Sequence, residues 1–391
     1  ARPLRIVHVT RETGADRRFG IGRSLAPVLE ALERRGHAVH YLTQEDLGAR
    51  GRAWQQRLAR VIEPLAVSRH GDAARSLVGT WAERINMGRV AAKAARRLDA
   101  DAVHLHDPWL AWGWLRSRAW HRSAARWGVS QHGYGAYAHA TREEGLPSTP
   151  AILARLVRLE CRVLQQADWV VCPTDAARAQ LARDLALPEP PPHWHHVPHA
   201  RPRHAGAVHS GQARGEPPHV VAIGRLDPVK RMEAVVQACV RLGRPIRLTV
   251  LGGGDAARLQ ALVPAGAAMT VDVHVTDDVA ACLATADVYV SASRNESFGL
   301  ANLEALAQGV PAVCTAVGGV PEVTAGAAWL VPGGDEGLAE RLAEAMRMLL
   351  DDDALARTLG ARGAERARSW PDADAVAERL ERLYRPPGGA T

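Results

Sequence analysis

The sequence has very few lysines, and its cysteines follow no ligand pattern. Lys93 and Lys230 are the only lysines among 49 basic residues, so almost all positive charge comes from arginine. The five cysteines lie scattered in apolar segments without C-x-x-C spacing, which predicts reduced core thiols of a cytoplasmic protein. No uncharged apolar run reaches about 18 residues, and the first residues show no signal-peptide core. We therefore expect neither a membrane span nor secretion.

Signatures that would assign a cofactor or a metal are also absent. The dinucleotide pattern G-x-G-x-x-G fails twice: Leu25 stands where a third glycine would follow Gly20, and Ala257 fails the same test after Gly252. This argues against a nicotinamide-dependent dehydrogenase. The acidic run at 351–353 fits a helix cap better than a metal site, and the histidines in the middle of the chain share no helix face. We expect no cofactor and no metal requirement.

Length and charge distribution indicate two domains. A chain of 391 residues exceeds the usual size of one domain. Residues 1–200 carry 29 basic and 19 acidic residues, whereas residues 201–391 carry 20 and 23. The basic first half fits an anionic acceptor, an anionic membrane surface or an arginine-rich genome, and we expect no nucleic-acid partner. From the proline, glycine and histidine content of the middle, we expect a first domain at 1–200, a linker at 201–217, a second domain at 218–370, and a C-terminal helix and tail at 371–391.

Each half opens with the same local pattern. An apolar strand at 4–9 is followed by a glycine-containing loop and a helix at 23–35, and the strand at 220–225 begins a similar series. This pattern predicts an α/β fold with two doubly wound domains, whose parallel sheets are covered on both faces. We expect further strands at 38–43, 102–106, 129–131, 168–173, 247–251 and 286–290. We expect helices at 150–166 and 372–384, two helices within 335–368, and a helical stretch at 50–98 whose second helix runs from Trp81 to Arg97. Residues 188–218 are expected to be irregular.

The segment after the strand at 286–290 carries the clearest chemistry. A polar loop leads into a short helix at 298–308 whose only charged residue is Glu304, and Glu296 lies eight positions earlier. A helix that starts at the carboxyl edge of a parallel sheet presents N–H groups and a positive dipole end to a phosphate. Carboxylates, in turn, accept hydrogen bonds from sugar hydroxyls. Arg225 and Lys230, between a strand and the next helix, add two phosphate-binding cations.

The flanks of the two glutamates resemble a known family. Glu296 lies in S-R-N-E-S-F-G-L, Glu304 lies in L-E-A-L-A-Q-G-V-P-A-V, and G-G-V-P-E follows. Together they resemble the E-x7-E signature of retaining glycosyltransferases of the GT-B fold, family four. The resemblance implies two Rossmann-like domains facing across a cleft, with the C-terminal helix crossing back to the first domain. It also implies metal-independent transfer from a nucleoside diphosphate sugar.

The resemblance assigns roles to individual residues. Glu304 would bind the ribose, Glu296 the donor sugar, and Arg225 with Lys230 the diphosphate; His132 would lie beside the reacting face of the sugar. The catalytic group is thus Glu296, His132, Arg225 and Lys230. The remaining donor-binding residues implied by the family are Gly20, Gly252, Gly253, His274, Val275 and the backbone of Phe298, Gly299 and Leu300. The family carries N-G where this chain has residues 197–200, so no donor contact is assigned there.

The candidate acceptor-binding residues lie in the first half of the chain. Trp109 follows a strand end and is a candidate for stacking on an acceptor, as is Tyr134, although tryptophans and histidines in such places are often core residues. Glu143 and Glu144 could meet an acceptor hydroxyl or remain solvated loop acids. These are the predicted acceptor-binding residues.

The sequence leaves several functions open. We favour transfer from a UDP-sugar, ahead of a GDP-sugar, to a small soluble acceptor such as a sugar, cyclitol or natural-product scaffold. The arginine-flanked helix at 52–65 leaves a membrane lipid acceptor as an alternative, although peripheral membrane contact is not favoured. A nucleotide-sugar epimerase and a non-catalytic sugar-nucleotide-binding protein also remain open.

Overall fold

The computed structural model describes residues 2–13, 20–143, 149–203 and 216–387. The chain forms two compact units: residues 1–200 together with 373–391, which we call unit 1, and residues 201–372, which we call unit 2. The expected linker at 201–217 lies mostly outside the described residues.

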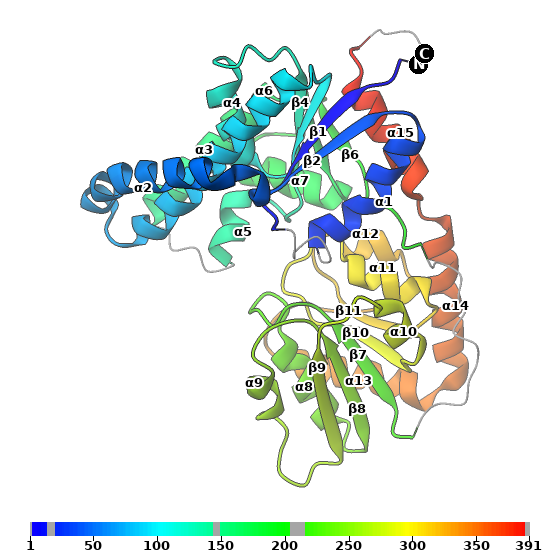
Figure 1. Cartoon of the computed structure of the whole chain (residues 1–391). Helices are drawn as coiled ribbons and strands as arrows, with labels where there is room; N and C mark the ends of the chain where they lie inside the picture. The colour runs from blue at the N-terminus through cyan, green and yellow to red at the C-terminus, as the bar shows by residue number, and fades with distance from the viewer. Residues whose placement is uncertain (1, 14–19, 144–148, 204–215, 388–391) are drawn as a thin grey trace. The chain divides into compact units, whose positions relative to one another are not determined.

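Unit 1 is built on a six-stranded parallel sheet in the order β2-β1-β3-β4-β5-β6 (Figure 1). Its strands are β1 (Arg5–Val9), β2 (Ala38–Leu42), β3 (Ala102–Leu105), β4 (Arg126–Ser130), β5 (Trp169–Cys172) and β6 (Trp194–His196). The chain moves from β1 outward to β2 and then returns to the other side of β1 to form β3. The strand order therefore reverses between β1 and β3, where ligands of such sheets commonly bind.

Helices cover both faces of this sheet. They are α1 (Gly20–Arg34), α2 (Gly48–His70), α3 (Ala73–Arg97), α4 (Pro108–Arg118), α5 (Tyr137–Glu143), α6 (Pro150–Gln166), α7 (Asp175–Asp184) and α15 (Ala373–Tyr384). Val7 and Val9 of β1 join the core under α3 and α4, whereas Ile6 joins the core under α1 and α15. The C-terminal helix thus belongs to unit 1, which confirms the expected crossing back.

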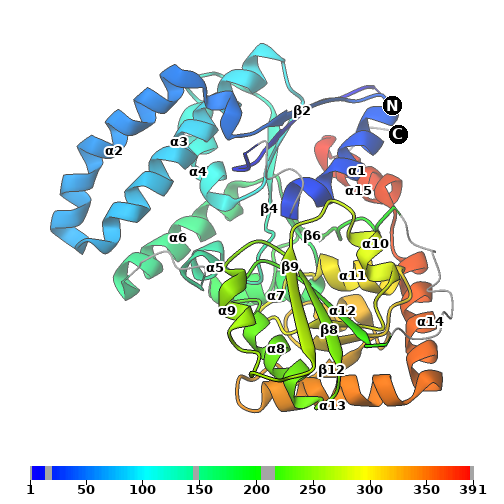
Figure 2. The ribbon, with the colours of Figure 1, turned by 60° about the horizontal axis from the view of Figure 1, so that its bottom comes forward.

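Unit 2 repeats the plan with the order β12-β11-β10-β7-β8-β9, again all parallel. Its strands are β7 (His219–Ile223), β8 (Ile246–Leu251), β9 (Met269–His274), β10 (Val288–Ser291), β11 (Ala312–Thr315) and β12 (Trp329–Val331). Its helices are α8 (Met232–Arg241), α9 (Ala256–Gln260), α10 (Val279–Ala284), α11 (Leu300–Ala307), α12 (Val320–Thr324), α13 (Leu338–Asp351) and α14 (Asp353–Ser369). Figure 2 shows α8 and α9 beside β8 and β9. Here the order reverses between β7 and β10.

The structure departs from the sequence expectations in two places. The segment at 188–218, expected to be irregular, contains β6. This strand has only three residues, two of them histidines, so it shows no apolar pattern. The stretch at 50–98 holds two helices as expected, but α2 does not bury its apolar side: Val61 is 69% exposed and Leu65 is 63% exposed. None of the helices among the described residues is both long and apolar enough to cross a membrane.

Candidate functional site

The reversal point of unit 2 brings together two of the predicted site residues. Lys230 follows β7, and Glu296 follows β10, so the side chains approach from adjacent strand ends. The Nζ of Lys230 lies 2.6 Å from Oε2 of Glu296, and the two side chains are 26% and 18% exposed. A charged pair therefore lies at the sheet edge, and it is still partly open to solvent.

Arg231 holds the loop that carries Glu296. Its backbone is left-handed (φ 49°), and its guanidinium is buried. Nε donates to the carbonyl of Ala292 (2.7 Å), Nη2 to that of Ser293 (2.9 Å) and Nη1 to Oδ1 of Asp335 (2.7 Å). The Arg231 side chain thus fixes the two residues that follow β10. The sequence analysis gave Arg231 no role.

The start of α11 requires a glycine. Gly299 has φ 83° and ψ 60° and immediately precedes the first residue of the helix. A Cβ there would lie 2.6 Å from Nδ2 of Asn302, whose Oδ1 accepts a hydrogen bond from the buried Tyr289 hydroxyl (2.9 Å). Glu304, on the same helix, is 8% exposed. The backbone turn therefore sets the direction of α11, and with it the placement of Glu304 relative to the loop of Glu296.

Phe298 and Leu300 flank that glycine. The ring of Phe298 is buried and packs edge-on against Trp370 at 5.5 Å, so its side chain anchors the loop. Leu300 is the first residue of α11 and is only partly buried. The backbone at these positions, rather than the Phe298 ring, is what a donor could contact.

The loops after β7, β8 and β9 are joined through their backbones. A Cβ on Gly252 would lie 1.9 Å from the carbonyl oxygen of Gly224, so these two loops touch directly. Gly252 N–H donates to the carbonyl of His274 (2.9 Å), and Leu226 N–H donates to that of Gly253 (3.0 Å). Close packing between loops therefore already requires glycine at 252. The sequence interpretation had placed that requirement at the nucleotide.

Arg225, His274 and Val275 lie at the exposed side of these loops. The Arg225 side chain is 69% exposed, and its Nη2 lies 3.1 Å from Oδ2 of Asp227. His274 Nδ1 lies 2.9 Å from Oδ2 of Asp272, and Val275 is 54% exposed. The exposed ion pair between Arg225 and Asp227 contributes little to stability.

In unit 1, His132 follows β4 and joins a buried group of histidines. Its Nε2 lies 2.9 Å from Nδ1 of His106, and the two rings are stacked. Burial lowers the pKa of His132 from 6.5 to about 3, with a smaller contribution from His199, so the ring is neutral at physiological pH.

The predicted acceptor-binding residues have different environments. Trp109 is 1% exposed, with its ring edge-on to Tyr137 at 5.0 Å and near Trp81, so it has no open face and is left out of the proposed acceptor site. Tyr134 is partly buried, and Glu143 is exposed at the end of α5. Glu144 lies outside the described residues.

The start of α1 carries a carboxylate that the sequence analysis missed. Gly20 begins the helix with φ 53°, and the N–H of Gly22 donates to Oε1 of Glu12 (2.7 Å). The other oxygen, Oε2, accepts from the Tyr41 hydroxyl (2.7 Å). A negative charge at a helix N-terminus is favourable, so Glu12 stabilises this end of α1.

A second missed carboxyl supports the loop after His132. Glu160 of α6 is fully buried and accepts from the N–H groups of Tyr137 (2.8 Å) and Ala138 (3.2 Å). Burial raises the pKa of Glu160 to about 8, although the two backbone donors oppose the shift. The apolar helical pattern around Glu160 gave no signal for this role, because its partners lie on another element.

Comparisons with known proteins agree with this arrangement. The family model "Glycosyl transferases group 1" matches residues 217–352, and "Glycosyltransferase Family 4" matches residues 20–199. A D-inositol 3-phosphate glycosyltransferase of Kineococcus radiotolerans is 31% identical over 343 residues, which cover 76% of each chain.

Two other relatives are matched over a smaller share. A D-inositol 3-phosphate glycosyltransferase of Nocardia farcinica is 30% identical over 298 residues (69% of this chain), and this chain spans 63% of its length. An N-acetyl-α-D-glucosaminyl L-malate synthase of Bacillus anthracis is 31% identical over 173 residues (42% of this chain), and this chain spans 44% of its length.

Among solved structures, sucrose-phosphate synthase from Thermosynechococcus elongatus matches with a TM-score of 0.71 and 21% identity, over 98% of each chain. At this identity the likeness concerns the fold, two Rossmann-like domains of the GT-B class. The family models and the Kineococcus relative are the stronger finding, because they match the sequence itself. On their strength, the chain belongs to the group 1 glycosyltransferases, glycosyltransferase family 4.

Proposed function

We propose that this protein transfers a glycosyl group from a nucleoside diphosphate sugar to a hydroxyl of a small soluble acceptor, with retention and without a metal ion. The observation that carries the proposal is the Lys230–Glu296 pair, 2.6 Å apart, at the strand-order reversal of unit 2. Open α/β sheets bind ligands at this point. Lys230 would supply a cation for the diphosphate, and Glu296 a carboxylate for the sugar hydroxyls. The two groups are close enough to contact the same donor molecule.

Donor binding would replace the ion pairs of Lys230 and Arg225 with contacts to the diphosphate. Lys230 would leave Glu296 for a diphosphate oxygen, and the exposed Arg225 would swing from Asp227 to form paired hydrogen bonds with the same group. Glu296 would then accept hydrogen bonds from the donor sugar, and Glu304 from the ribose. The first turn of α11 adds its dipole, since α11 starts directly after Gly299.

In the reaction, the bond between the anomeric carbon and the phosphate oxygen breaks, and a bond to the acceptor oxygen forms on the same face. The departing diphosphate gains negative charge, which Lys230 and Arg225 stabilise in place of a metal ion. The proton of the acceptor hydroxyl passes to a phosphate oxygen. His132, neutral at physiological pH, would contact the sugar by hydrogen bonding rather than by charge.

The acceptor class is supported by the relatives. Their names specify inositol 3-phosphate and L-malate, which are small hydroxyl compounds with anionic groups. The excess of basic residues in the first half fits such an acceptor. We propose an anionic or polyhydroxylated small molecule in the cytoplasm, with UDP as the first nucleotide to test.

A lipid acceptor is the second candidate, and one observation favours it. An apolar pocket of about 460 Å³ in unit 1 is lined by residues of α2, α3 and α6, with Arg155 and Arg158 among them. The exposed Val61 and Leu65 lie on α2 as well. Apolar surface beside arginines can bind an anionic amphiphile.

Calorimetric titration with UDP, GDP and TDP, in the presence of a chelator, tests the donor site. One nucleotide should bind to the wild type and to Lys93→Ala, which removes the other, exposed lysine on α3, but not to Lys230→Ala. Absence of binding by all three nucleotides would contradict the proposal. Turnover with the matching nucleotide sugars, on inositol phosphates and on lipid vesicles, then separates the two acceptor classes.

A further inference from the structure

Arg231 combines an unfavourable backbone conformation with a buried, hydrogen-bonded side chain. It lies between Lys230 and the first residue of α8, with φ 49° and ψ 44°, in the left-handed region that residues other than glycine rarely adopt. The residue is 7% exposed. Such a backbone persists only where the surrounding contacts hold it, so the partners of the guanidinium explain why an arginine is found here.

The guanidinium connects the loops that follow three strands. Arg231 itself follows β7, and its Nε and Nη2 donate to the carbonyls of Ala292 and Ser293, which follow β10. Its Nη1 donates to the carbonyl of Gly333 (2.8 Å) and to Oδ1 of Asp335, both in the loop after β12. Lysine has one nitrogen and could not reach all four acceptors, whereas the planar fork of arginine can.

Asp335 is the exposed end of this arrangement. Its carboxylate accepts from Arg231 and, at 3.2 and 3.1 Å, from Nη2 of Arg294 in the loop after β10. The Asp335 side chain is 66% exposed, so these ion pairs contribute less than the buried bonds to the carbonyls. The bonds between guanidinium and carbonyls therefore provide most of the connection between the loops.

These bonds lie on one side of the Lys230–Glu296 pair, and a backbone bond lies on the other. The carbonyl of Val229 accepts from the N–H of Arg294 (2.7 Å). The loop after β7 is thus joined to the loop after β10 both directly before and directly after Lys230. Glu296 lies two residues beyond Arg294, and its carbonyl accepts from the N–H of Gly319 (2.9 Å).

The two loops therefore do not depend on the ion pair for their alignment. Donor binding, as proposed above, would separate Lys230 from Glu296 at the stage when both side chains must stay in place. The bonds of Arg231 and the backbone bond of Arg294 involve neither charged group of the pair, so they remain when it opens. Groups that are already in position need no reorganisation during the reaction, which lowers its barrier.

We propose that Arg231 is a positioning residue for glycosyl transfer: its guanidinium keeps the loops of Lys230 and Glu296 aligned when the donor replaces their ion pair. This inference rests on the proposed function, because it assigns Arg231 a role in that reaction. Arg231 acts through the two loops and not by contact with the substrate.

Turnover of the full chain tests the proposal. Arg231→Gly removes the guanidinium and leaves a residue that adopts φ 49° without strain. With the nucleotide sugar that titration identifies, kcat should fall by about tenfold or more, since a displacement of about 1 Å can cost about a hundredfold. Arg122→Gly is the matched control, because Arg122 also has φ 49° but is exposed, in the turn between α4 and β4. It should retain the wild-type kcat.

Two further measurements separate positioning from general destabilisation. All variants are assayed at a temperature where circular dichroism shows them folded. A low concentration of guanidinium chloride should restore part of kcat in Arg231→Gly, whereas the same concentration of sodium chloride should not. If Arg231 acts through Glu296, then Arg231→Gly should lower kcat by a smaller factor in a Glu296→Gln background than in the wild type. A purely structural defect would lower kcat by the same factor in both.

Hydrogen exchange tests the loops without any substrate. The N–H of Arg294 should exchange faster in Arg231→Gly than in the wild type, and at the wild-type rate in Arg122→Gly. If the wild type transfers no sugar, the proposed function fails and the positioning role with it, while exchange still shows whether Arg231 holds the loops. With an active wild type, unchanged kcat in Arg231→Gly, an equal loss in the Glu296→Gln background, or unchanged exchange at Arg294 would each overturn the inference alone.

Discussion

The two units share a sheet plan but differ in what they place at the reversal of strand order. In unit 2 the paired strands meet there through Val220 and Val288, and the polar groups lie on the loops beyond. In unit 1 the polar groups are inside the strands, where His8 faces His104. One site is therefore charged and partly exposed, and the other is neutral and buried.

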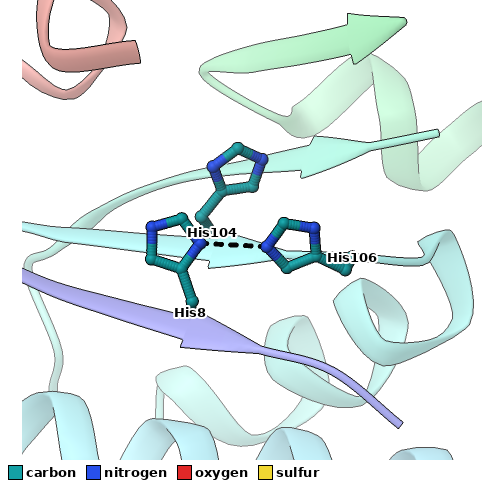
Figure 3. Close-up of side chains that lie close together, drawn as sticks. All are labelled: His8, His104 and His106. Carbon is teal, nitrogen blue, oxygen red and sulfur yellow. Dashed lines mark hydrogen bonds between the residues drawn. The ribbon is translucent and has the colours of Figure 1, made fainter. Parts of the chain in front are cut away.

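This difference separates two kinds of response. Lys230 and Glu296 can exchange each other for a ligand, because both are charged and reach solvent. The buried histidines cannot gain charge without a large desolvation cost, so they stay neutral. The same fold thus places a charged pair at the sheet edge in one unit and neutral histidines within the sheet in the other (Figure 3).

The largest predicted effect of this contrast is on acid stability. Burial lowers the pKa of His8 and His132 to about 3, and those of His104 and His106 in the same direction. Between pH 6.5 and 3 the unfolded chain binds more protons than the folded one. The free energy of unfolding should therefore fall as pH falls below 6.5, by up to about 1.4 kcal/mol per pH unit for each histidine.

Unit 1 should consequently unfold before unit 2 on acidification. Nine of the eleven tryptophans lie in unit 1, so intrinsic fluorescence reports mainly on it, and hydrogen exchange resolves unit 2 separately. Simultaneous acid unfolding of both units, or none between pH 6 and 4, would show that the histidines are not buried neutral groups.

Glu160 should act in the opposite direction at higher pH. Its folded pKa of about 8 lies above the ordinary value of 4.5, so the folded state keeps a proton that the unfolded chain releases. Taken alone, this contribution lowers stability by about 1.4 kcal/mol per unit as pH rises from 4.5 to 8, and above pH 6.5 it is separated from the opposite effect of the histidines. Glu160→Gln should remove this slope in urea titrations, whereas Glu189→Gln, at an exposed glutamate, should retain it. If the pH dependence of the free energy of unfolding persists in Glu160→Gln, it arises from another titrating group.

Loss of either cation of unit 2 should strongly reduce turnover. We expect Lys230→Ala and Arg225→Ala each to lower kcat by about a hundredfold or more, because each stabilises charge on the departing diphosphate. Arg225→Lys should recover only part of the activity, since a lysine cannot form the paired hydrogen bonds. Lys93→Ala serves as the control. Unchanged turnover in both alanine variants would refute their assignment.

The smallest predicted effect concerns the backbone. Gly299→Ala should destabilise unit 2 by about 1–2 kcal/mol, because alanine disfavours a φ of 83° and its Cβ would press on Asn302. Gly334→Ala is the matched control in the same unit, since no atom lies within 4 Å of the added Cβ. Urea denaturation measures both. Equal stability of the two variants would mean that the α11 turn can relax.

The approach of Lys230 and Glu296 in unit 2 follows from the sequence for a physical reason. Both residues lie in loops that follow apolar strands, and parallel strands end at one edge, so local patterns suffice to place them side by side. The α/β class and the C-terminal helix in unit 1 were also predictable, the latter through the family resemblance. The helix at 150–166 was predicted with the bounds that α6 has.

The buried cluster of His8, His104 and His106 was not predictable in the same way. His8 appeared as one more residue of an apolar strand, and its partner Tyr384 is 376 positions away. For Trp109, the sequence predicted its position after a strand but not its burial. That burial comes from contacts with Trp81 and Tyr137 on other elements. Burial of a single side chain follows from tertiary packing, which the local pattern does not contain.

The position of α15 in unit 1 has a consequence for synthesis of the chain. Val376, Leu380 and Tyr384 complete the apolar layer over β1 and β3, yet they leave the ribosome only after all of unit 2 has been made. During translation the apolar layer over His8 and His104 therefore lacks α15. Unit 1 cannot finish folding before unit 2 has been synthesised. Synthesis of α15, rather than of residues 1–200, is the event that closes this core.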